Sequence, residues 1–461
     1  MFSKILVANR GEIALRIIRS AKELGLRCVA VYSEPDRNSL HTMLADEKIC
    51  IGPAKASDSY LSIPNLLSAA EITKADAIHP GYGFLAENPR FAEICEGSGI
   101  TFIGPPANLM RLVGDKNRAR KEMKKAKLPI IPGSEEVVDE LSEVKKVIQK
   151  LAYPIILKAA SGGGGKGLRI VRSASQLEEQ FSIAQNEAKA AFGDPSLYLE
   201  KYIQGARHIE VQIIGDKKGN IMAFSERECS IQRKHQKLIE ETPSSFIDEK
   251  YRRKLIKAVE EAARLIGYQS LGTFEFLVDE QKEFYFMEAN TRVQVEHPIT
   301  EMVYGIDLIK EQIKTAAGEK LSYSRDLKMK GHSLECRINA ECSKTFIPSP
   351  GRIDFLVLPG GEGIRVDSGA YTGWVIPPDY DSLVAKIIAF SPTRKDTIRK
   401  MQTAMEMTTV VGIKTNIPLH LSILSNSNFI KGEYDIQFME KFLAKKTNNQ
   451  LSEQNTKTEA K

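Results

Sequence analysis

Short apolar runs alternate with helical patterns through the first 113 residues. We expect an amphipathic helix at 13–24 and buried strands at 5–8, 28–32, 77–78 and 101–103. Strands separated by helices are typical of a parallel sheet with helices on both faces, so residues 1–113 are predicted to form a doubly wound α/β domain. The first turn reads NRGEIA instead of G-x-G-x-x-G, which disfavours a nicotinamide-binding domain.

Strand patterns dominate the middle of the chain, and a polar segment ends it. Helices are expected over the basic run DKNRARKEMKKAKLP and near 176–190, 250–266 and 307–317. Residues 331–390 are strand-like with Pro-Gly turns, and a helix is expected at 394–407. Residues 446–461 contain a single leucine, so they are predicted to be a disordered tail.

The composition is that of an ordinary globular chain with about three domains in its 461 residues. The 65 basic and 59 acidic residues leave a net charge of only +6, which gives no support for nucleic-acid binding. Charged residues interrupt every long apolar stretch, so neither a secretory signal nor a membrane span is expected, and a cytoplasmic location is predicted. The six cysteines form no C-x-x-C pair and are predicted to be reduced packing residues.

A glycine loop with two lysines is the first candidate for chemistry. The segment PIILKAASGGGGKGLRIV places Lys158, four glycines and Lys166 between two apolar strands. Glycines let a backbone close over a bulky anion, and the lysines supply positive charge for phosphate oxygens. A flexible linker would need neither the strands nor the lysines, so we predict nucleotide phosphate binding.

Two acidic residues lie at matched positions of a predicted hairpin formed by GTFEFLVD and EFYFMEAN. Glu275 and Glu288 lie at nearly equal distances from the turn and are expected to face each other across the ladder. A hard cation such as Mg²⁺ relieves the repulsion between opposed carboxylates, and Asn290 can add a neutral oxygen. A solvated acidic pair is the alternative, but the neighbouring phenylalanines favour a buried hairpin.

The segment NTRVQVEHP follows the hairpin. If it is extended, Arg292, Gln294 and Glu296 share one face with Asn290. A guanidinium fork beside a carboxylate suits a planar anion such as bicarbonate and a base that deprotonates it. A half-exposed amphipathic strand would have the same pattern.

Two further polar segments are consistent with a phosphate-rich substrate. RHIEVQIIGD places His208, Glu210 and Gln212 on one strand face, without an H-E-x-x-H zinc motif. SERECSIQRKHQKLIEETP gathers several cations, and a solvated surface loop explains them equally well. These cations are Arg227, Arg233, Lys234, His235 and Lys237.

Ten motifs occur in one order along residues 1–445: VANRGEIALRI, HPGYGFLAENP, GDKNRAR, KAASGGGGKGLRIV, RHIEVQ, ERECSIQRKHQK, GTFEFL, EANTRVQVEHPITEM, GHSLECRINAE and PPDYDSLVAK. In this order they resemble the biotin carboxylase family, the ATP-grasp component of acetyl-CoA carboxylase. The resemblance implies an α/β and α+β fold with a doubly wound pre-ATP-grasp domain (1–113), an ATP-grasp domain (114–318, lid about 131–203) and a C-terminal biotin carboxylase domain (319–445). It also implies that ATP and bicarbonate form carboxyphosphate, whose carboxyl group passes to biotin on a carrier protein.

The resemblance also implies roles for individual residues. The residues similar to nucleotide ligands are Lys116, Lys158, the lid glycines Gly163, Gly164 and Gly165, Glu200, Lys201, Ile203, His208, Gln232, His235 and Lys237. Glu275 and Glu288, with Asn290, resemble the ligands of Mg²⁺ or Mn²⁺. Arg292, Gln294 and Val295 resemble a bicarbonate site, Glu296 the general base, and Arg337 the cation that stabilises deprotonated biotin.

The resemblance implies partners as well: a biotin carboxyl carrier protein, carboxyltransferase subunits and a second copy of the chain in a homodimer, in the first half-reaction of malonyl-CoA synthesis. A subunit of another acyl-CoA or pyruvate carboxylase would share these site residues and stays an alternative. A silent ATP-binding regulator is a further alternative, although it would not need Glu296, Arg292 or Arg337. Lys166 and Ala289 depart from the family's more frequent arginine and methionine. The AMEM segment has Glu406 where a biotin-attachment motif has lysine, so the carrier is expected to be separate.

Overall fold

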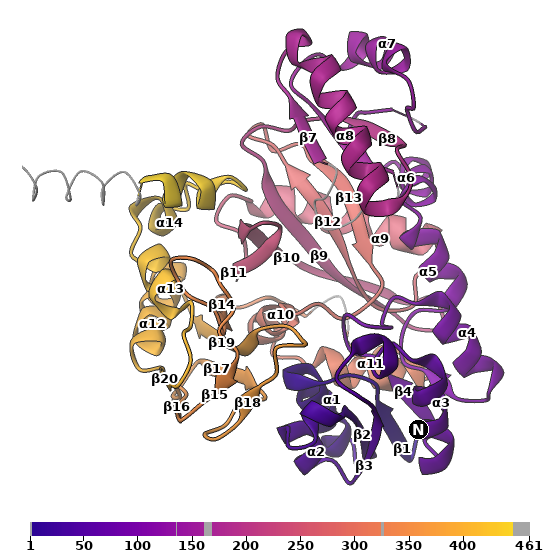
Figure 1. The fold of residues 1–461 in the computed structure, drawn as a ribbon, viewed down its shortest axis with the longest axis vertical. Helices are drawn as coiled ribbons and strands as arrows, with labels where there is room; N and C mark the ends of the chain where they lie inside the picture. The colour runs from indigo at the N-terminus through magenta and orange to yellow at the C-terminus, as the bar shows by residue number, and fades with distance from the viewer. Residues whose placement is uncertain (1, 135, 161–167, 324–326, 446–461) are drawn as a thin grey trace, which may run out of the picture.

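The computed structural model describes residues 2–134, 136–160, 168–323 and 327–445. The predicted lid glycines Gly163 to Gly165, Lys166 and the predicted tail lie outside these residues. Figure 1 shows three parts: an N-terminal α/β unit at the lower right, a small sheet with helices at the top, and a large sheet that extends from the centre to the lower left. Among the described helices, none combines the length and apolar character needed to cross a bilayer.

The N-terminal unit is a parallel sheet in the order β3-β2-β1-β4-β5. The four predicted strands are confirmed. The fifth, β3, was missed because it lies at the sheet edge, where only one of its six residues is fully buried. The strands are β1 Lys4–Val7, β2 Arg27–Ser33, β3 Glu47–Gly52, β4 Ala77–His79 and β5 Thr101–Phe102.

Helices cover both faces of this sheet, as a doubly wound domain requires. Ile5 and Val7 of β1 face the predicted amphipathic helix α1 (Gly11–Glu23), whereas Leu6 and Ala8 face the other side. The other helices of the unit are α2 Leu40–Leu44, α3 Ile63–Thr73, α4 Pro89–Gly97 and α5 Ala107–Gly114, with 3₁₀ turns at Glu34–Asp36 and Ala56–Asp58.

The upper part contains a three-stranded antiparallel sheet in the order β7-β6-β8. Its strands are β6 Ile155–Ala159, β7 Leu168–Val171 and β8 Leu197–Lys201. The glycine segment connects the paired strands β6 and β7, as predicted. Helices α7 Leu141–Leu151 and α8 Leu177–Phe192 pack on this sheet, with a 3₁₀ turn at Ala174–Gln176. Helix α6 Lys116–Lys125 packs in the core of the large sheet instead.

One eight-stranded sheet runs through the middle and C-terminal segments in the order β13-β12-β9-β10-β11-β14-β19-β17. It continues past residue 318 because β11 pairs with β14, and the predicted domain boundaries stay predictions. The strands are β9 Arg207–Gly215, β10 Ile221–Arg233, β11 Gln236–Thr242, β12 Ser270–Val278, β13 Phe284–Asn290, β14 His332–Asn339, β17 Ile364–Ser368 and β19 Leu383–Ser391.

Helices and short strands complete the fold around the large sheet. The predicted helices are confirmed as α9 Glu249–Leu265, α11 Leu308–Ala316 and α12 Arg394–Glu406. Helices α10 His297–Tyr304, α13 Ile417–Leu424 and α14 Ser427–Lys431 were not predicted. Two small antiparallel pairs lie nearby: β15 Gly351–Arg352 with β18 Val375–Ile376, and β16 Phe355–Val357 with β20 Thr409–Val411.

The two faces of β14 differ in polarity. Leu334, Cys336 and Ile338 point into the apolar core of the C-terminal part, whereas the alternate residues Glu335 and Arg337 face away from it. Helix α10 lies near β11, β14 and β19. The cysteine prediction holds for four residues and is wrong for Cys50, which is exposed, and Cys342, which is half-buried.

Candidate active site

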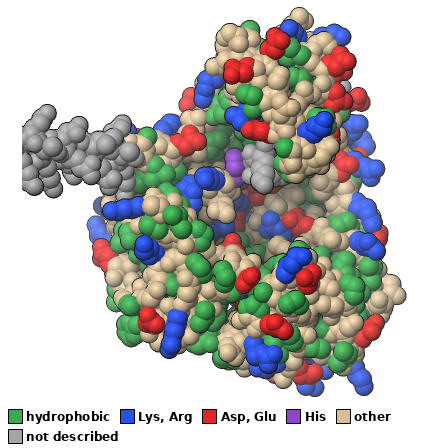
Figure 2. Space-filling model, in the orientation of Figure 1, with side chains coloured by type: hydrophobic (Ala, Val, Ile, Leu, Met, Phe, Trp, Pro, Cys, Tyr) green, Lys and Arg blue, Asp and Glu red, His purple; other side chains and the backbone are tan. Residues whose placement is uncertain are grey.

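A cavity of about 1400 Å³ opens between the three parts of the molecule. Figure 2 shows the hollow below the upper part. It is lined by the predicted residues Lys116, Lys158, Glu200, Lys201, Ile203, His208, Gln232, His235, Lys237, Glu275, Glu288, Asn290, Arg292, Gln294, Val295 and Arg337. Glu296 lies directly behind this lining, bonded to Lys237 and Arg337.

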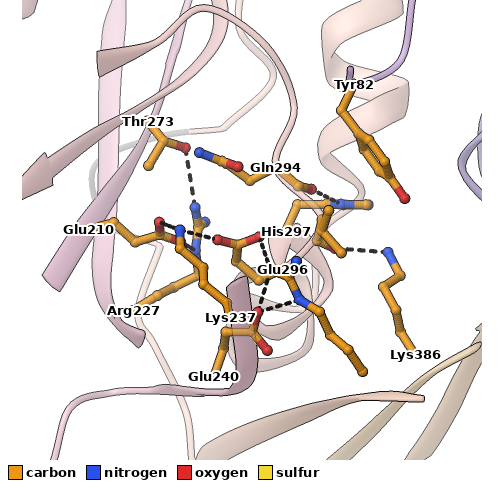
Figure 3. Close-up of polar contacts among 12 residues, drawn as sticks. Tyr82, Glu210, Arg227, Lys237, Glu240, Thr273, Gln294, Glu296, His297 and Lys386 are labelled. Atoms are coloured by element: carbon orange, nitrogen blue, oxygen red, sulfur yellow. Dashed lines mark hydrogen bonds and ion pairs between the residues drawn. The ribbon is translucent and has the colours of Figure 1, made fainter. Parts of the chain in front are cut away.

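Lys237 is the cation at the centre of the site. Its Nζ lies 2.6 Å from Glu210 Oε2 and 2.6 Å from Glu296 Oε1 (Figure 3). It also lies 3.4 Å from Glu275 Oε1. Burial by itself would lower the pKa of Lys237, but the three carboxylates outweigh it and hold the pKa well above the usual value. The ammonium group therefore stays charged and holds the carboxylates together.

Glu296 is fully buried at the N-terminal end of α10. Burial disfavours its charge, yet Lys237 and Arg337 (Nη2 to Oε2, 2.9 Å) outweigh burial and keep the pKa of Glu296 well below its ordinary value. The carboxylate is therefore ionised at neutral pH and can accept a proton.

The hairpin β12–β13 pairs Glu275 with Glu288, as predicted. The predicted symmetry about the turn is wrong, because Phe276 pairs with Phe286 and leaves Met287 as an extra residue in a bulge. The bulge restores the opposed positions of the two carboxylates. Glu288 is exposed at the cavity.

Glu275 is buried and lies within hydrogen-bond distance of three side chains. His208 Nε2 lies 2.7 Å from Oε2, and the amide nitrogens of Asn290 and Gln294 lie 2.8 and 3.1 Å from Oε1. Burial raises the pKa of Glu275, but Lys237 and His208 outweigh it and lower the pKa below the usual range. The carboxylate is therefore ionised at neutral pH.

The segment after Asn290 is not a strand, so the predicted extended face is wrong. The predicted side chains converge through a turn that leads into α10: Arg292 Nη1 lies 2.8 Å from Gln294 Oε1, and Nη2 lies 3.1 Å from Asn290 Oδ1. Val293 points into the core instead.

Glu87 fixes this turn and was missed by the sequence analysis. Its Oε1 accepts from Thr291 N at 2.9 Å, and its Oε2 accepts from Arg292 Nε at 2.8 Å. Glu87 lies in the motif HPGYGFLAENP, but a separation of 205 residues gave no sign of the contact.

Glu200 and Lys201 line the nucleotide end of the predicted site. Glu200 forms ion pairs with Lys158 and with Arg120 (Nη1 to Oε1, 2.7 Å). Lys201 Nζ donates to the backbone oxygens of Ala152 and Tyr153 at 3.2 and 3.3 Å. Lys158 is thus positioned by Glu200 at the base of the glycine segment.

Arg227 is not available to a substrate phosphate, so its predicted role is wrong. The side chain is fully buried and bonded to Glu210, and it donates to Gln212 Oε1 at 2.7 Å and Thr300 Oγ1 at 3.0 Å. It is a structural counter-ion beneath Lys237. Lys234 and His235, by contrast, lie in the β10–β11 turn and line the cavity.

Arg337 has two carboxylate partners. Its Nε lies 2.6 Å from Glu240 Oε1, and its Nη2 lies 2.9 Å from Glu296 Oε2. Glu240 was not predicted, because its position in IEET carries no sequence signal for this contact.

Comparison with known proteins agrees with this geometry. Three family models match in order: "Biotin carboxylase, N-terminal domain" over residues 1–110, "Carbamoyl-phosphate synthase L chain, ATP binding domain" over 115–324, and "Biotin carboxylase C-terminal domain" over 335–441. A biotin carboxylase of Haemophilus influenzae is 53% identical over 96% of this chain and 99% of its own. The chain belongs to the biotin carboxylase family.

Solved structures and further relatives agree with the assignment of this chain to the biotin carboxylase family. A Campylobacter jejuni biotin carboxylase complex has a TM-score of 0.92 at 48% identity, covering 96% of this chain and 99% of that one. The biotin carboxylase domain dimer of Hydrogenobacter thermophilus 2-oxoglutarate carboxylase, solved with MgADP and bicarbonate, has a TM-score of 0.90 at 46% identity, covering 96% and 98%. A pyruvate carboxylase component of Methanothermobacter thermautotrophicus is 48% identical over 96% of this chain and 90% of its own.

The predicted biotin carboxylase fold is confirmed. Of the two departures from the family pattern, Lys166 lies outside the described residues. Ala289 packs against the core beneath the β12–β13 hairpin, where a small side chain is accommodated.

Proposed function

We propose that this protein uses ATP and bicarbonate to carboxylate biotin carried on a separate protein, as a carbon–nitrogen ligase. The observation that carries the proposal is the convergence of an ionised buried carboxylate, Glu296, with Lys237 and Arg337 behind a cavity that also contains Arg292 and an opposed carboxylate pair. This set provides a base, an anion site and charge neutralisation in one place.

ATP would bind at the upper end of the cavity. Lys116 and Lys158 would contact the phosphates of ATP. Glu200, Lys201 and Ile203 would lie nearer its adenine ring. His208, Gln232, His235 and Lys237 complete this proposed set, together with Gly163, Gly164 and Gly165.

The opposed carboxylates fit a hard divalent cation. Glu275 and Glu288 are ladder partners at the cavity, and carboxylate oxygens are the donors that Mg²⁺ or Mn²⁺ prefers. Asn290 presents its amide nitrogen to Glu275, so its oxygen would join the set only after the amide turns. The bound cation would neutralise phosphate charge.

Bicarbonate would bind to Arg292, Gln294 and the backbone N–H of Val295, close to Glu296. The low pKa of Glu296 makes it a weak base while Lys237 and Arg337 hold it. An arriving anion competes for these cations, which raises the pKa of Glu296 and favours proton transfer from bicarbonate. Carboxyphosphate could then form, and closure over the cavity would protect it from water.

Arg337 would stabilise the biotin anion. A ureido nitrogen that has lost its proton carries negative charge onto oxygen, and a guanidinium group fixed nearby lowers the energy of that state. Free phosphate from the breakdown of carboxyphosphate is the proposed base for this second proton.

We propose a biotin carboxyl carrier protein and carboxyltransferase subunits as partners, a homodimeric assembly and a cytoplasmic location. The parent reaction would be the acetyl-CoA carboxylase half-reaction of malonyl-CoA synthesis. Relatives named for pyruvate and 2-oxoglutarate carboxylases make those carboxylases the alternative. Co-purification followed by identification of the biotinylated polypeptide distinguishes them.

The decisive assay measures ATP hydrolysis with and without bicarbonate and free biotin. Turnover that requires bicarbonate and rises with biotin supports the proposal. ATP binding without such turnover would instead support a silent regulator.

A further inference from the structure

Two buried carboxyl groups, Glu240 and Glu335, face each other behind Arg337. They are register partners on β11 and β14, and both are fully buried. Directly opposed side chains on one face of an antiparallel pair have Cβ atoms about 5 Å apart. Two like charges are therefore placed side by side in a medium that screens them poorly.

Most of the oxygen atoms of this pair lack hydrogen-bond donors. Arg337 Nε donates to Glu240 Oε1 at 2.6 Å. Glu240 Oε2 and both oxygens of Glu335 have no hydrogen-bond partner among the described residues. A buried carboxylate without donors is costly, and protonation removes that cost.

The nearby cations are already matched by other anions. Lys386 of β19 faces Glu335, but its Nζ donates to Val295 O at 2.8 Å and lies 3.1 Å from Glu12. Lys237 of β11 is held by Glu210 and Glu296.

The remaining neighbours add no positive charge. Glu296 at the start of α10 and Cys229 of β10 face the pair. Among the described residues, Arg337 is thus the one nearby cation that is bonded directly to the pair. Its single positive charge cannot balance the negative charges of Glu240, Glu335 and Glu296 together. Burial is the main cause that raises the pKa of Glu240 to about 7 and that of Glu335 well above its usual value.

We propose that Glu240 and Glu335 hold one proton between them at neutral pH, and that Glu240, the ionised member, is a positioning residue that aims Arg337 into the cavity. This inference rests on the proposed function, because it concerns the attraction of Arg337 for the biotin anion.

The proton shared by Glu240 and Glu335 affects how strongly Arg337 attracts the biotin anion. When Glu296 accepts a proton from bicarbonate, it loses its charge and its hold on Arg337, and Glu240 keeps the guanidinium in place. If the pair lost its remaining proton, a second negative charge behind Arg337 would weaken the attraction for an anionic substrate. The pair therefore sets the effective charge that Arg337 presents.

Three variants test the positioning of Arg337 by Glu240 and the proton shared with Glu335. They are Glu240→Gln, Glu335→Gln and the matched control Glu241→Gln. Glu241 is adjacent and equally buried, but it faces away from the cavity toward Arg394. Their kcat/KM for free biotin and KM for ATP are measured from pH 6 to 9 against the unchanged protein.

Glu240→Gln is expected to lower kcat/KM for biotin about tenfold or more, because a neutral amide oxygen replaces the charged acceptor of Arg337 Nε and holds the guanidinium less firmly, while KM for ATP stays the same. Glu335→Gln mimics the protonated acid, so its kcat/KM for biotin at neutral pH should equal that of the unchanged protein. It should also move the alkaline decline of kcat/KM to higher pH, because the pair can no longer gain a second charge. Glu241→Gln should leave both the value and the profile unchanged.

Two results would overturn the proposal: a Glu240→Gln enzyme equal to the Glu241→Gln control, or a Glu335→Gln pH profile that superimposes on that of the unchanged protein. If Glu240→Gln does not fold, infrared spectroscopy of the unchanged protein and Glu335→Gln decides. A protonated carboxyl band at neutral pH that disappears in Glu335→Gln supports the shared proton, and its absence contradicts it. This band does not depend on turnover, so a protein that fails to carboxylate biotin would refute the proposed function separately.

Discussion

Individual side chains in this site are held by ion pairs that also set their protonation. Lys237 is bonded to Glu210 and Glu296, and Arg337 is bonded to Glu240 and Glu296. Glu296 stays ionised because Lys237 and Arg337 are fixed within hydrogen-bond distance, and both cations stay charged because carboxylates surround them. A substrate anion enters by competing with these internal partners.

The first prediction concerns the proposed base. Glu296→Gln keeps the volume of the side chain but cannot accept a proton, so bicarbonate-dependent turnover should fall by about 100-fold or more. Affinity for ATP, measured by equilibrium binding, should change little because the phosphate-end residues are untouched. Normal turnover in this variant would show that another group is the base.

The second prediction concerns Glu87. Glu87→Ala removes the acceptor for Thr291 N and Arg292 Nε, so the turn that holds Arg292 should loosen and the KM for bicarbonate should rise about tenfold. Glu93→Ala is the matched control, because Glu93 forms an ion pair with Arg111 on the surface of α4. Equal KM values in the two variants would refute the positioning role.

At the scale of elements, the β12–β13 hairpin creates the proposed metal site through an irregularity. The extra residue Met287 shifts the register between Phe286 and Glu288, and Glu288 thereby faces Glu275. A regular hairpin with the same turn would pair Glu275 with Met287. The bulge is therefore a functional feature of β13.

Glu288→Lys tests this site. A lysine opposite Glu275 would form an ion pair in place of two cation ligands, so Mg²⁺-dependent ATP turnover should be lost. A titration of activity against Mg²⁺ concentration measures the loss. If the titration curve were unchanged, the paired carboxylates would not be the metal ligands.

On the scale of the whole molecule, buried ion pairs join parts that are distant in sequence. Lys386 of β19 contacts Glu12 of α1 and the backbone oxygen of Val295 beside the proposed base. Figure 3 shows Lys386 at the edge of the group around Glu296. Arg16 of α1 and Arg365 of β17 meet on Glu301 of α10. These contacts join the N-terminal unit to the large sheet and hold the cavity walls that those two parts form.

Lys386→Met should destabilise the protein, because it leaves Glu12 without its buried cation at a cost of about 3–5 kcal/mol, whereas Asp367 keeps its ion pair with Arg365. The midpoint of thermal unfolding should fall by several degrees, whereas Lys395→Met, on the exposed surface of α12, should leave it unchanged. Equal midpoints would show that the buried cation contributes little.

Acid stability should depend on Glu241, which ties β11 to Arg394 and His332. Burial opposes its charge, but Arg394 and His332 lower the pKa of Glu241 to about 2. A folded-state pKa below the unfolded value of ~4.3 stabilises the protein above that value, and this contribution is lost as the pH falls toward 2.

The stability difference between the unchanged protein and Glu241→Gln should therefore shrink between about pH 4.5 and pH 2. Thermal midpoints measured across this range check the expectation. A difference that stays constant would mean that Glu241 is not the group that titrates.

The sequence alone was sufficient for features that depend on neighbours along the chain. Four of the five N-terminal strands, helix α1 and the existence of the β12–β13 hairpin follow from apolar periodicity and a short turn, because these interactions close small loops. Ordered motifs were also sufficient for the family and for the residues that line the cavity. The predictions of an extended face after Asn290 and of a phosphate-binding role for Arg227 were wrong, because tertiary contacts override the local sequence pattern.

Only the tertiary structure determined the partners of these residues. Arg337 meets Glu240 across 97 residues, and Arg292 meets Glu87 across 205. Such contacts depend on how β11 pairs with β14 and how the N-terminal unit packs on the hairpin, which periodicity does not encode. Local pattern fixes which face of a strand is polar, but the charge opposite each side chain is fixed by the packing of distant segments.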